Sequence, residues 1–246
     1  MIHLDGSSLT LEQLAAIADG AEDVALAPGA ASQVDAARAV IDAKAAGDAP
    51  VYGVNTGFGA LAETAIPRDQ LGALQLNLLR SHAAGVGEPL PVRSVRASMA
   101  LRANVLARGF SGIRRSTLEL LLAMLNRRVH PLVPSRGSVG ASGDLAPLAH
   151  LALVLVGEGL ASVDGSAPMP GIDALRAVGL SPITLESKEG LALINGTQPS
   201  TAVAALATIG AMNLARAADV AAALSIDGLR GSMRPFDPRI HDARPH

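Results

Sequence analysis

The sequence predicts a mainly helical protein. Hydrophobic residues make up 49% of the 246-residue chain, charged residues 17% and aromatic residues 2%, and tryptophan is absent. Because the hydrophobic share comes mainly from Ala, Leu and Val, the core must be built from small aliphatic side chains, which suits closely packed helices. Several segments also repeat their apolar residues at helical spacing.

The N-terminal segment predicts two helices followed by a loop. Thr10 and Gln13 form a capping box ahead of an apolar stripe, and Gly20 is a stop signal. A second helical pattern runs over residues 32–47. The segment PVYGVNTGFG, residues 50–59, then breaks the periodicity with three glycines, so we expect a structured, exposed loop.

The middle of the chain predicts three helices. Helical periodicity resumes at Leu71 and ends near His82, just before a glycine-rich break. Pro91 is well placed at the start of the next helix, and Ser116 with Glu119 forms another capping box ahead of a leucine stripe. His82 is therefore expected at a junction between a helix and a loop.

A glycine-rich turn then meets the start of a helix. The run RGSVGASGD ends at Asp144, which is the expected N-cap of a helix over residues 145–156. Asp164 and Gly165 predict a two-residue hairpin, the only local sheet expected.

The C-terminal part predicts one long helix. An Ala-rich helical pattern runs from Pro199 to about Leu224, and it is too apolar on more than one side to be solvated alone. We expect no stable element in the polar tail that follows.

Composition excludes several classes of function. A net charge of −2 and a pI near 6.3 give no electrostatic footprint for nucleic acid. The glycine-rich turn lacks the lysine and spacing of a nucleotide loop, and the histidines lack the spacing of metal ligands, so neither a nucleotide nor a metal is expected. With no cysteine, no secretory signal and no apolar segment at 145–156 long enough to span a membrane, a cytoplasmic protein is expected.

The tripeptide Ala141-Ser142-Gly143 could form an electrophile. The amide nitrogen of Gly143 can attack the carbonyl carbon of Ala141 in a sharply bent backbone, because glycine leaves the approach open. Attack followed by loss of one water gives a five-membered ring, and loss of the Ser142 hydroxyl with its α-hydrogen, as a second water, gives a methylidene-imidazolone. Taken alone, however, the tripeptide indicates an ordinary turn, because the chain has 25 glycines and abundant alanine.

A longer set of strings resembles one enzyme family. GSVGASGDLAPLAHLAL resembles the signature of the aromatic amino acid ammonia-lyases and aminomutases, in which this internal tripeptide becomes the methylidene-imidazolone cofactor. VYGVNTGFG, LLRSHAAGVGEPL, RANVLARGFSGIRR, KEGLALINGTQ and PFDPRIHDAR resemble segments of histidine ammonia-lyases, in the same order and at similar spacings. The resemblance covers essentially the whole chain.

The resemblance implies roles for individual residues. It makes Tyr52 the base near the cofactor, His82 a contact to the substrate side chain and Asn195 a ligand around cofactor and substrate, while Asp144 assists formation of the ring by Ala141, Ser142 and Gly143. Each has a plainer alternative: Tyr52 could anchor its loop, His82 could stabilise a helix end and Asn195 could occupy a left-handed turn before Gly196.

The resemblance also implies a fold and a reaction. The fold is the ammonia-lyase/fumarase-like helical fold, with residues 1–200 forming the cofactor domain and 201–246 beginning a central helical bundle. The reaction is elimination of ammonia from L-histidine to give urocanate, because a polar residue at His82 suits an imidazole substrate. Tyrosine as substrate, aminomutase activity and an inactive fragment that only associates with homologous chains stay open.

Family chains are about twice as long as this one. The site is therefore expected to need residues from a C-terminal half, supplied by a companion chain or by the remainder of a longer protein, and the assembly is expected to be a homo-oligomer, a tetramer.

Overall fold

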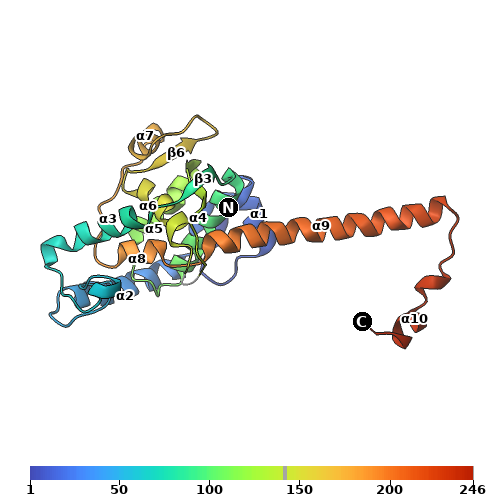
Figure 1. Cartoon of the computed structure of the whole chain (residues 1–246), viewed down its shortest axis with the longest axis horizontal. Coiled ribbons are helices and arrows are strands. Elements are labelled where there is room, and N and C mark those ends of the chain that lie inside the picture. The colour runs from blue at the N-terminus through green and yellow to red at the C-terminus, as the bar shows by residue number, and fades with distance from the viewer. Residues whose placement is uncertain (141–142, 246) are drawn as a thin grey trace. The chain divides into compact units, whose positions relative to one another are not determined.

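The computed structural model describes residues 1–140 and 143–245 and confirms the helical fold class. The chain divides into two compact units, Met1–Leu206 and Ala207–His246. Figure 1 shows that helices dominate and that the strands are short. The helices that lie wholly within the first unit are α1 (Leu11–Ala18), α2 (Pro28–Ala45), α3 (Leu71–His82), α4 (Val92–Ala107), α5 (Arg115–Asn126), α6 (Leu145–Leu155), α7 (Gly171–Ala177) and α8 (Glu189–Ile194), with short 3-10 turns η1 (Gly59–Leu61) and η2 (Arg68–Gln70).

The core of the first unit is aliphatic, as the composition predicts. Helix α4 packs against α1 and α5, while α3, α6 and α8 pack against one another (Figure 1). The buried hydrophobic residues described are Leu, Ala, Val, Ile and Met, without an aromatic ring. Small side chains let these helices approach closely, and the second group of helices carries most of the predicted site.

Local signals predicted several helix boundaries correctly. The capping box of Thr10 and Gln13 is present at α1, and α3 ends at His82 as expected. Helix α2 begins earlier than the expected residue 32, because Pro28 occupies its first turn, where a missing N–H costs nothing.

The capping box expected at Ser116 and Glu119 is wrong. Helix α5 begins one residue before Ser116, and its N-cap, Arg114, makes no side-chain capping bond. The buried carboxylate of Glu189 instead accepts hydrogen bonds from the Arg114 amide at 3.1 Å and from the Thr117 hydroxyl at 2.6 Å. A distant residue thus accepts the N-cap amide and one side-chain hydroxyl of the first turn.

The expectation of a single sheet is also wrong, because three small sheets are present among the described residues. Strand β1 (Ile2–Leu4) pairs in parallel with β2 (Val24–Leu26), with Ile2 opposite Val24. The antiparallel pairs are β3 (Val86–Pro89) with β5 (Pro134–Arg136), β4 (Val129–Pro131) with β6 (Leu160–Val163), and β6 with β7 (Met169–Pro170).

The hairpin signal at Asp164 and Gly165 is confirmed in part. Both residues have positive φ angles, 47° and 82°, as the favoured hairpin turn requires. However, Ala161 pairs with Met169, so the connection between β6 and β7 is longer than the two residues expected.

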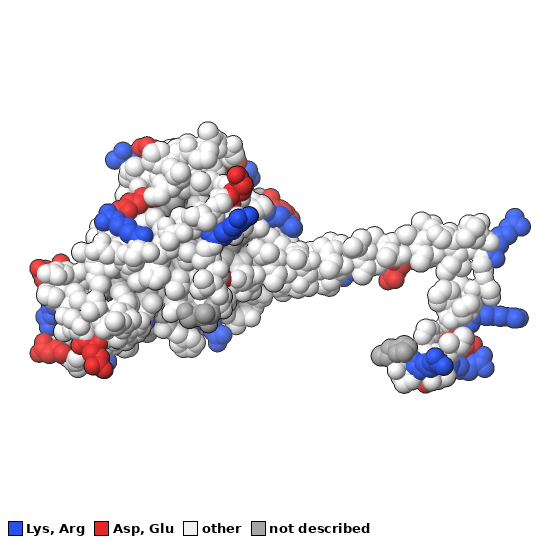
Figure 2. Space-filling model, in the orientation of Figure 1, with Lys and Arg blue, Asp and Glu red and all other residues white. Residues whose placement is uncertain are grey.

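Helix α9 (Gln198–Gly228) begins in the first unit and continues in the second. In the second unit its exposed apolar side chains include Leu214, Val220 and Leu224. Figure 2 shows few charged groups along it, whereas charges of both signs are scattered over the first unit. The tail was expected to lack structure, but it forms η3 (Arg234–Phe236) and α10 (Pro238–Ala243), which Asp237 caps.

One helical stretch has the length and composition needed to cross a membrane, although the sequence analysis found no such segment. It spans Glu189–Gly228 and includes α9. Long helices of soluble bundles share these properties, and Arg216, Asp219 and Asp227 would be costly within a bilayer.

Candidate functional site

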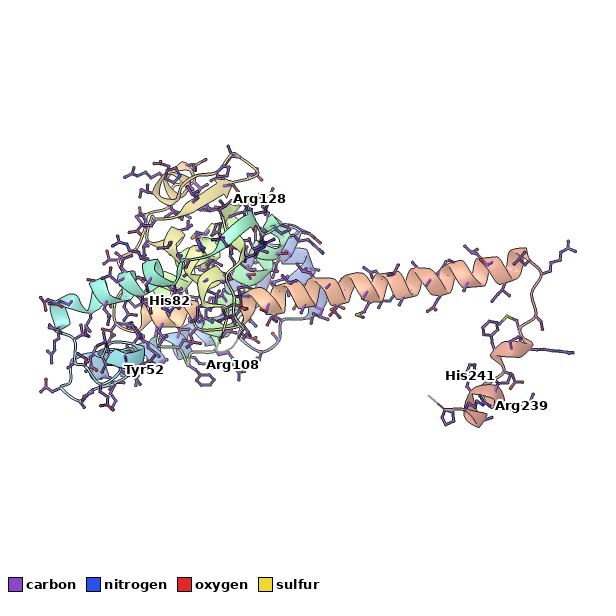
Figure 3. The ribbon with its side chains drawn as sticks, in the orientation of Figure 1. Tyr52, His82, Arg108, Arg128, Arg239 and His241 are labelled. Atoms are coloured by element: carbon purple, nitrogen blue, oxygen red, sulfur yellow. The ribbon has the colours of Figure 1, made fainter. Side chains whose placement is uncertain are left out.

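Three predicted site residues line one cavity of the first unit. Tyr52, His82 and Asn195 come from separate segments, and the cavity they share has a volume of about 340 Å³. Figure 3 shows Tyr52 in the loop that follows α2 and His82 at the end of α3. The remaining wall is apolar except for backbone, and it consists of Phe58, Gly59, Leu78, Leu145, Leu191 and Ile194.

The loop that carries Tyr52 is only partly exposed. Residues 53–57 are buried, so the expectation of an exposed loop was wrong for its centre, although Tyr52 itself is 51% exposed. The Asn55 side chain fastens the loop by accepting the Val51 amide at 2.7 Å. The Tyr52 and Phe58 rings form a T-shaped pair, with an angle of 86° between their planes and centroids 5.9 Å apart. Tyr52 is thus presented by a structured loop and oriented by one aromatic neighbour.

His82 is held by its own helix. Its Nδ1 lies 2.9 Å from the carbonyl oxygen of Leu78 and 3.1 Å from the Ser81 hydroxyl. A carbonyl oxygen can only accept a hydrogen bond, so Nδ1 carries a proton and donates a hydrogen bond to the Leu78 carbonyl. Within the described part of the chain Nε2 has no partner, and in the neutral ring it is an acceptor available to a ligand.

A second histidine fixes the loop after His82. The Gly85 amide donates to Nε2 of His150 at 3.0 Å, and burial lowers the pKa of His150, which favours this neutral acceptor. His150 therefore has a structural role in this loop.

Asn195 lies at the C-terminal end of α8, where its amide donates to the Leu191 carbonyl at 3.0 Å. Its φ of −85° is not left-handed, so the alternative of an Asn in a left-handed turn is wrong. The residue lines the cavity and leads directly into Gly196.

Gly143 and Asp144 lie against Gly196. Gly143 has φ of +134°, and a Cβ placed on it would come within 2.9 Å of the Gly196 carbonyl oxygen. The Asp144 amide donates to that same oxygen at 2.7 Å. Ala141 and Ser142, the other two predicted cofactor residues, lie outside the described residues. The structure thus joins the predicted Asp144 and Asn195 segments through backbone contacts.

The Asp144 carboxylate does not cap α6, although the residue occupies the expected N-cap position. It accepts a hydrogen bond from the Ser138 hydroxyl. It also accepts hydrogen bonds from the Ser200 amide at 2.8 Å and from the Ser200 hydroxyl at 2.7 Å. Burial opposes its ionisation, but these donors outweigh burial and hold the pKa of Asp144 below its ordinary value. Neither Ser138 nor Ser200 was predicted from the sequence: Ser138 lies in the glycine-rich run, and no local signal identifies Ser200.

No group of three or more His, Cys, Asp or Glu side chains that could hold a metal occurs among the described residues.

His130 is a buried histidine whose Nε2 lies 3.2 Å from Nη1 of Arg96. Burial, and after it the charge of Arg96, lowers the pKa of His130 to about 4. It belongs to the core rather than to the cavity.

Known proteins resemble this chain over its full length. A histidine ammonia-lyase of Anaeromyxobacter dehalogenans (strain 2CP-C) is 59% identical over 247 residues, which cover 98% of this chain and 49% of that protein. The crystal structure of histidine ammonia-lyase from Trypanosoma cruzi has a TM-score of 0.91 at 46% identity and covers 100% of this chain and 47% of that one. Tyrosine aminomutase from Streptomyces globisporus has a TM-score of 0.92 at 38% identity and covers 100% and 46%.

The chain spans about half the length of the curated relatives it matches. The model of the family described as aromatic amino acid lyase matches residues 9–246, which is nearly the whole chain. By this match and by its identity to these relatives, the chain belongs to the aromatic amino acid lyase family.

Proposed function

We propose that the protein to which this chain belongs eliminates ammonia from L-histidine and releases urocanate. The observation that carries the proposal is the single cavity lined by Tyr52, His82 and Asn195. The names of relatives that are 51–59% identical, histidine ammonia-lyases, support the same substrate. The proposal therefore rests on both the cavity and the similarity.

The described residues around position 143 fit a methylidene-imidazolone formed by Ala141, Ser142 and Gly143. Gly143 has a positive φ and lies so close to Gly196 that a side chain would not fit, as a compressed backbone requires. When formed, this group supplies an electrophile that ordinary side chains lack. Asp144, held by Ser138 and Ser200, is in place to assist proton movements of the adjacent backbone.

His82 is the proposed contact to the imidazole side chain of the substrate. Because Nδ1 donates to Leu78, Nε2 accepts the imidazole N–H when His82 is neutral. An imidazole buried among Leu78, Leu145 and Leu191 without such a partner would lose the free energy of its hydrogen bonds to water. His82 thus favours histidine over an unsubstituted aromatic ring.

Tyr52 is the proposed base that removes a proton from the β-carbon of the substrate. That proton is weakly acidic, so the phenolic oxygen must be correctly oriented, and the edge contact with Phe58 restricts the ring. The Asn195 side chain, on the cavity wall, is proposed to hydrogen-bond the cofactor as negative charge develops.

The exposed apolar side chains of α9 are proposed to pack against helices of other copies. In the second unit Leu214, Val220 and Leu224 are 71%, 60% and 68% exposed. Contact of so many apolar side chains with water is unfavourable for an isolated helix. A homotetramer completed by the C-terminal part of the protein accounts for this surface. A sedimentation experiment that finds a non-associating monomer would overturn this part. A cytoplasmic location stays a prediction, which fractionation of cells can test.

An absorbance assay for urocanate tests the reaction. The full-length protein is supplied with L-histidine, and the products are separated by chromatography. Formation of urocanate and ammonia supports the proposal. A β-amino acid product identifies an aminomutase, and a mixture that contains only unchanged L-histidine identifies an assembly inactive toward histidine. L-Tyrosine in place of histidine is the matched control for substrate choice.

A further inference from the structure

A buried arginine lies behind the candidate site. Arg102, on α4, is 2% exposed, and within the described part of the chain no carboxylate pairs with it. Burial alone lowers its pKa to about 10. Because a buried cation without a counter-ion destabilises a fold, its presence calls for an account of what the guanidinium does.

Both terminal nitrogens of the Arg102 guanidinium donate to one short segment of the chain, while its buried Nε has no partner among the described residues. Nη1 donates to the Asn195 carbonyl at 3.1 Å and to Oε1 of Gln198 at 2.8 Å, and Nη2 donates to the Ala192 carbonyl. Two of these acceptors are carbonyls at the C-terminal end of α8, which lack partners within the helix and carry the negative end of its dipole. The guanidinium therefore fastens the end of α8 to the start of α9.

Gly196 connects this clamp to the cofactor segment. A Cβ placed on Gly196 would come within 2.2 Å of Nη1 of Arg102 and 2.1 Å of Oε1 of Gln198, so the glycine lies directly on the Arg102–Gln198 pair. On its other side, Gly196 touches Gly143 and accepts the Asp144 amide. Displacement of Arg102 would thus be transmitted through Gly196 to residues 143–144.

We propose that Arg102 is a positioning residue that presses the Asn195–Gly196 turn against Gly143 and Asp144. It thereby holds the backbone of Gly143 and Asp144 in place beside the proposed ring and keeps Asn195 at the cavity. This inference rests on the proposed function for its consequence in catalysis, but the clamp itself is a property of the chain. Lysine cannot replace it fully, since an ammonium group lacks the planar fork that reaches three acceptors.

A second buried arginine on the same helix provides the matched control. Arg96 donates to the carbonyls of Ile17 and Leu125 at 2.9 and 3.0 Å, and neither acceptor lines the cavity. Arg96→Met and Arg102→Met therefore both remove a buried guanidinium from α4, but only Arg102→Met should loosen the Asn195–Gly196 turn.

Hydrogen exchange of the Asp144 amide in the full-length protein tests the clamp. In Arg102→Met we expect this amide to exchange at least about tenfold faster, while in Arg96→Met it keeps its protection although stability falls. Arg102→Lys should lie between wild type and Arg102→Met, and it serves as the readout if the methionine variant does not fold. Equal protection of Asp144 in the Arg102 and Arg96 variants would overturn the proposal.

Intact-mass measurement of the same proteins adds a readout of ring formation. We expect Arg102→Met to retain the two waters that residues 141–143 lose on forming the ring, and Arg96→Met to lose them. A folded Arg102→Met protein that has lost both waters, as the wild type is expected to, would contradict the positioning role. If wild type makes no urocanate but its Asp144 exchange still depends on Arg102, the proposed function fails and the clamp stands.

Discussion

Nδ1 of His82 donates a hydrogen bond to the carbonyl oxygen of Leu78, one turn earlier in α3. This bond selects the nitrogen that carries the proton in the neutral ring and leaves Nε2 as the acceptor. The orientation of the proposed substrate contact is therefore set within one helix, before any ligand binds.

His82→Leu should lower kcat/KM for histidine by about 10- to 100-fold, because a substrate N–H would be buried without an acceptor. Stability should change by less than about 1 kcal/mol, since His82 lies half-buried at a helix end. Steady-state kinetics and thermal unfolding check both expectations. Ser81→Ala is the control at the same helix end, because it keeps the bond between His82 and Leu78; parallel losses of activity and stability in His82→Leu would instead indicate a structural residue.

Tyr52→Phe should reduce kcat by about 10²- to 10⁴-fold while KM stays nearly unchanged, as expected for loss of a group that transfers a proton. Among the described residues the Tyr52 hydroxyl has no hydrogen-bond partner, so the unfolding free energy should stay the same. Stopped-time urocanate assays and urea unfolding measure the two quantities. Retained turnover would remove Tyr52 from the mechanism, and Phe58→Leu should give a smaller loss through misorientation alone.

Ser200→Ala should destabilise the protein by about 1–3 kcal/mol, because it removes a hydroxyl that donates to the buried Asp144 carboxylate. Because the folded pKa of Asp144 is lowered, its stabilising contribution is present above its ordinary pKa and is lost as pH falls toward the folded value. The variant should therefore show a smaller loss of stability on acidification below about pH 4. Thr201→Ala, at the next and exposed position, is the control; a Ser200→Ala protein with wild-type stability would show that the contact contributes nothing.

The buried neutral His130 should make the protein less stable in mild acid. Its pKa falls from 6.5 to about 4 in the folded state, so only the unfolded chain takes up a proton between these values. The unfolding free energy should be constant above pH 6.5 and decrease by up to about 3 kcal/mol toward pH 4.

Urea unfolding at several pH values tests this sign and window. In His130→Asn the unfolding free energy should decrease less steeply on acidification. Some decrease should remain, because burial also lowers the pKa of His150. His3→Asn, at an exposed position, should keep the wild-type slope. An unchanged slope in His130→Asn would mean that another group causes the acid sensitivity.

The sequence predicted the elements that depend on neighbours in the chain. The capping box at Thr10 and the end of α3 at His82 both rest on interactions over a few residues, and both are confirmed. The start of α5 could not be predicted, because the amide of its N-cap, Arg114, donates to Glu189, 75 residues away. The parallel pairing of Ile2 with Val24 has the same cause, since no local pattern specifies a partner strand.

The site shows the same division. Tyr52, His82 and Asn195 were identified by resemblance of short strings, and the structure places them around one cavity, while their catalytic roles stay predictions. Ser200 was missed because its contact with Asp144 spans 56 residues, and its surroundings in the sequence are those of an ordinary helix start.

The backbone contact between Gly143 and Gly196 has a consequence for mutational scanning. Neither residue offers a side chain to a substrate, yet alanine at position 143 would bring its methyl group within 2.9 Å of a carbonyl oxygen and would also strain a φ of +134°. At position 196 the methyl group would overlap the Arg102–Gln198 pair. A library that replaces residues by alanine to find functional side chains would score both glycines as essential, although the steric part of that score measures only how closely two chain segments approach each other.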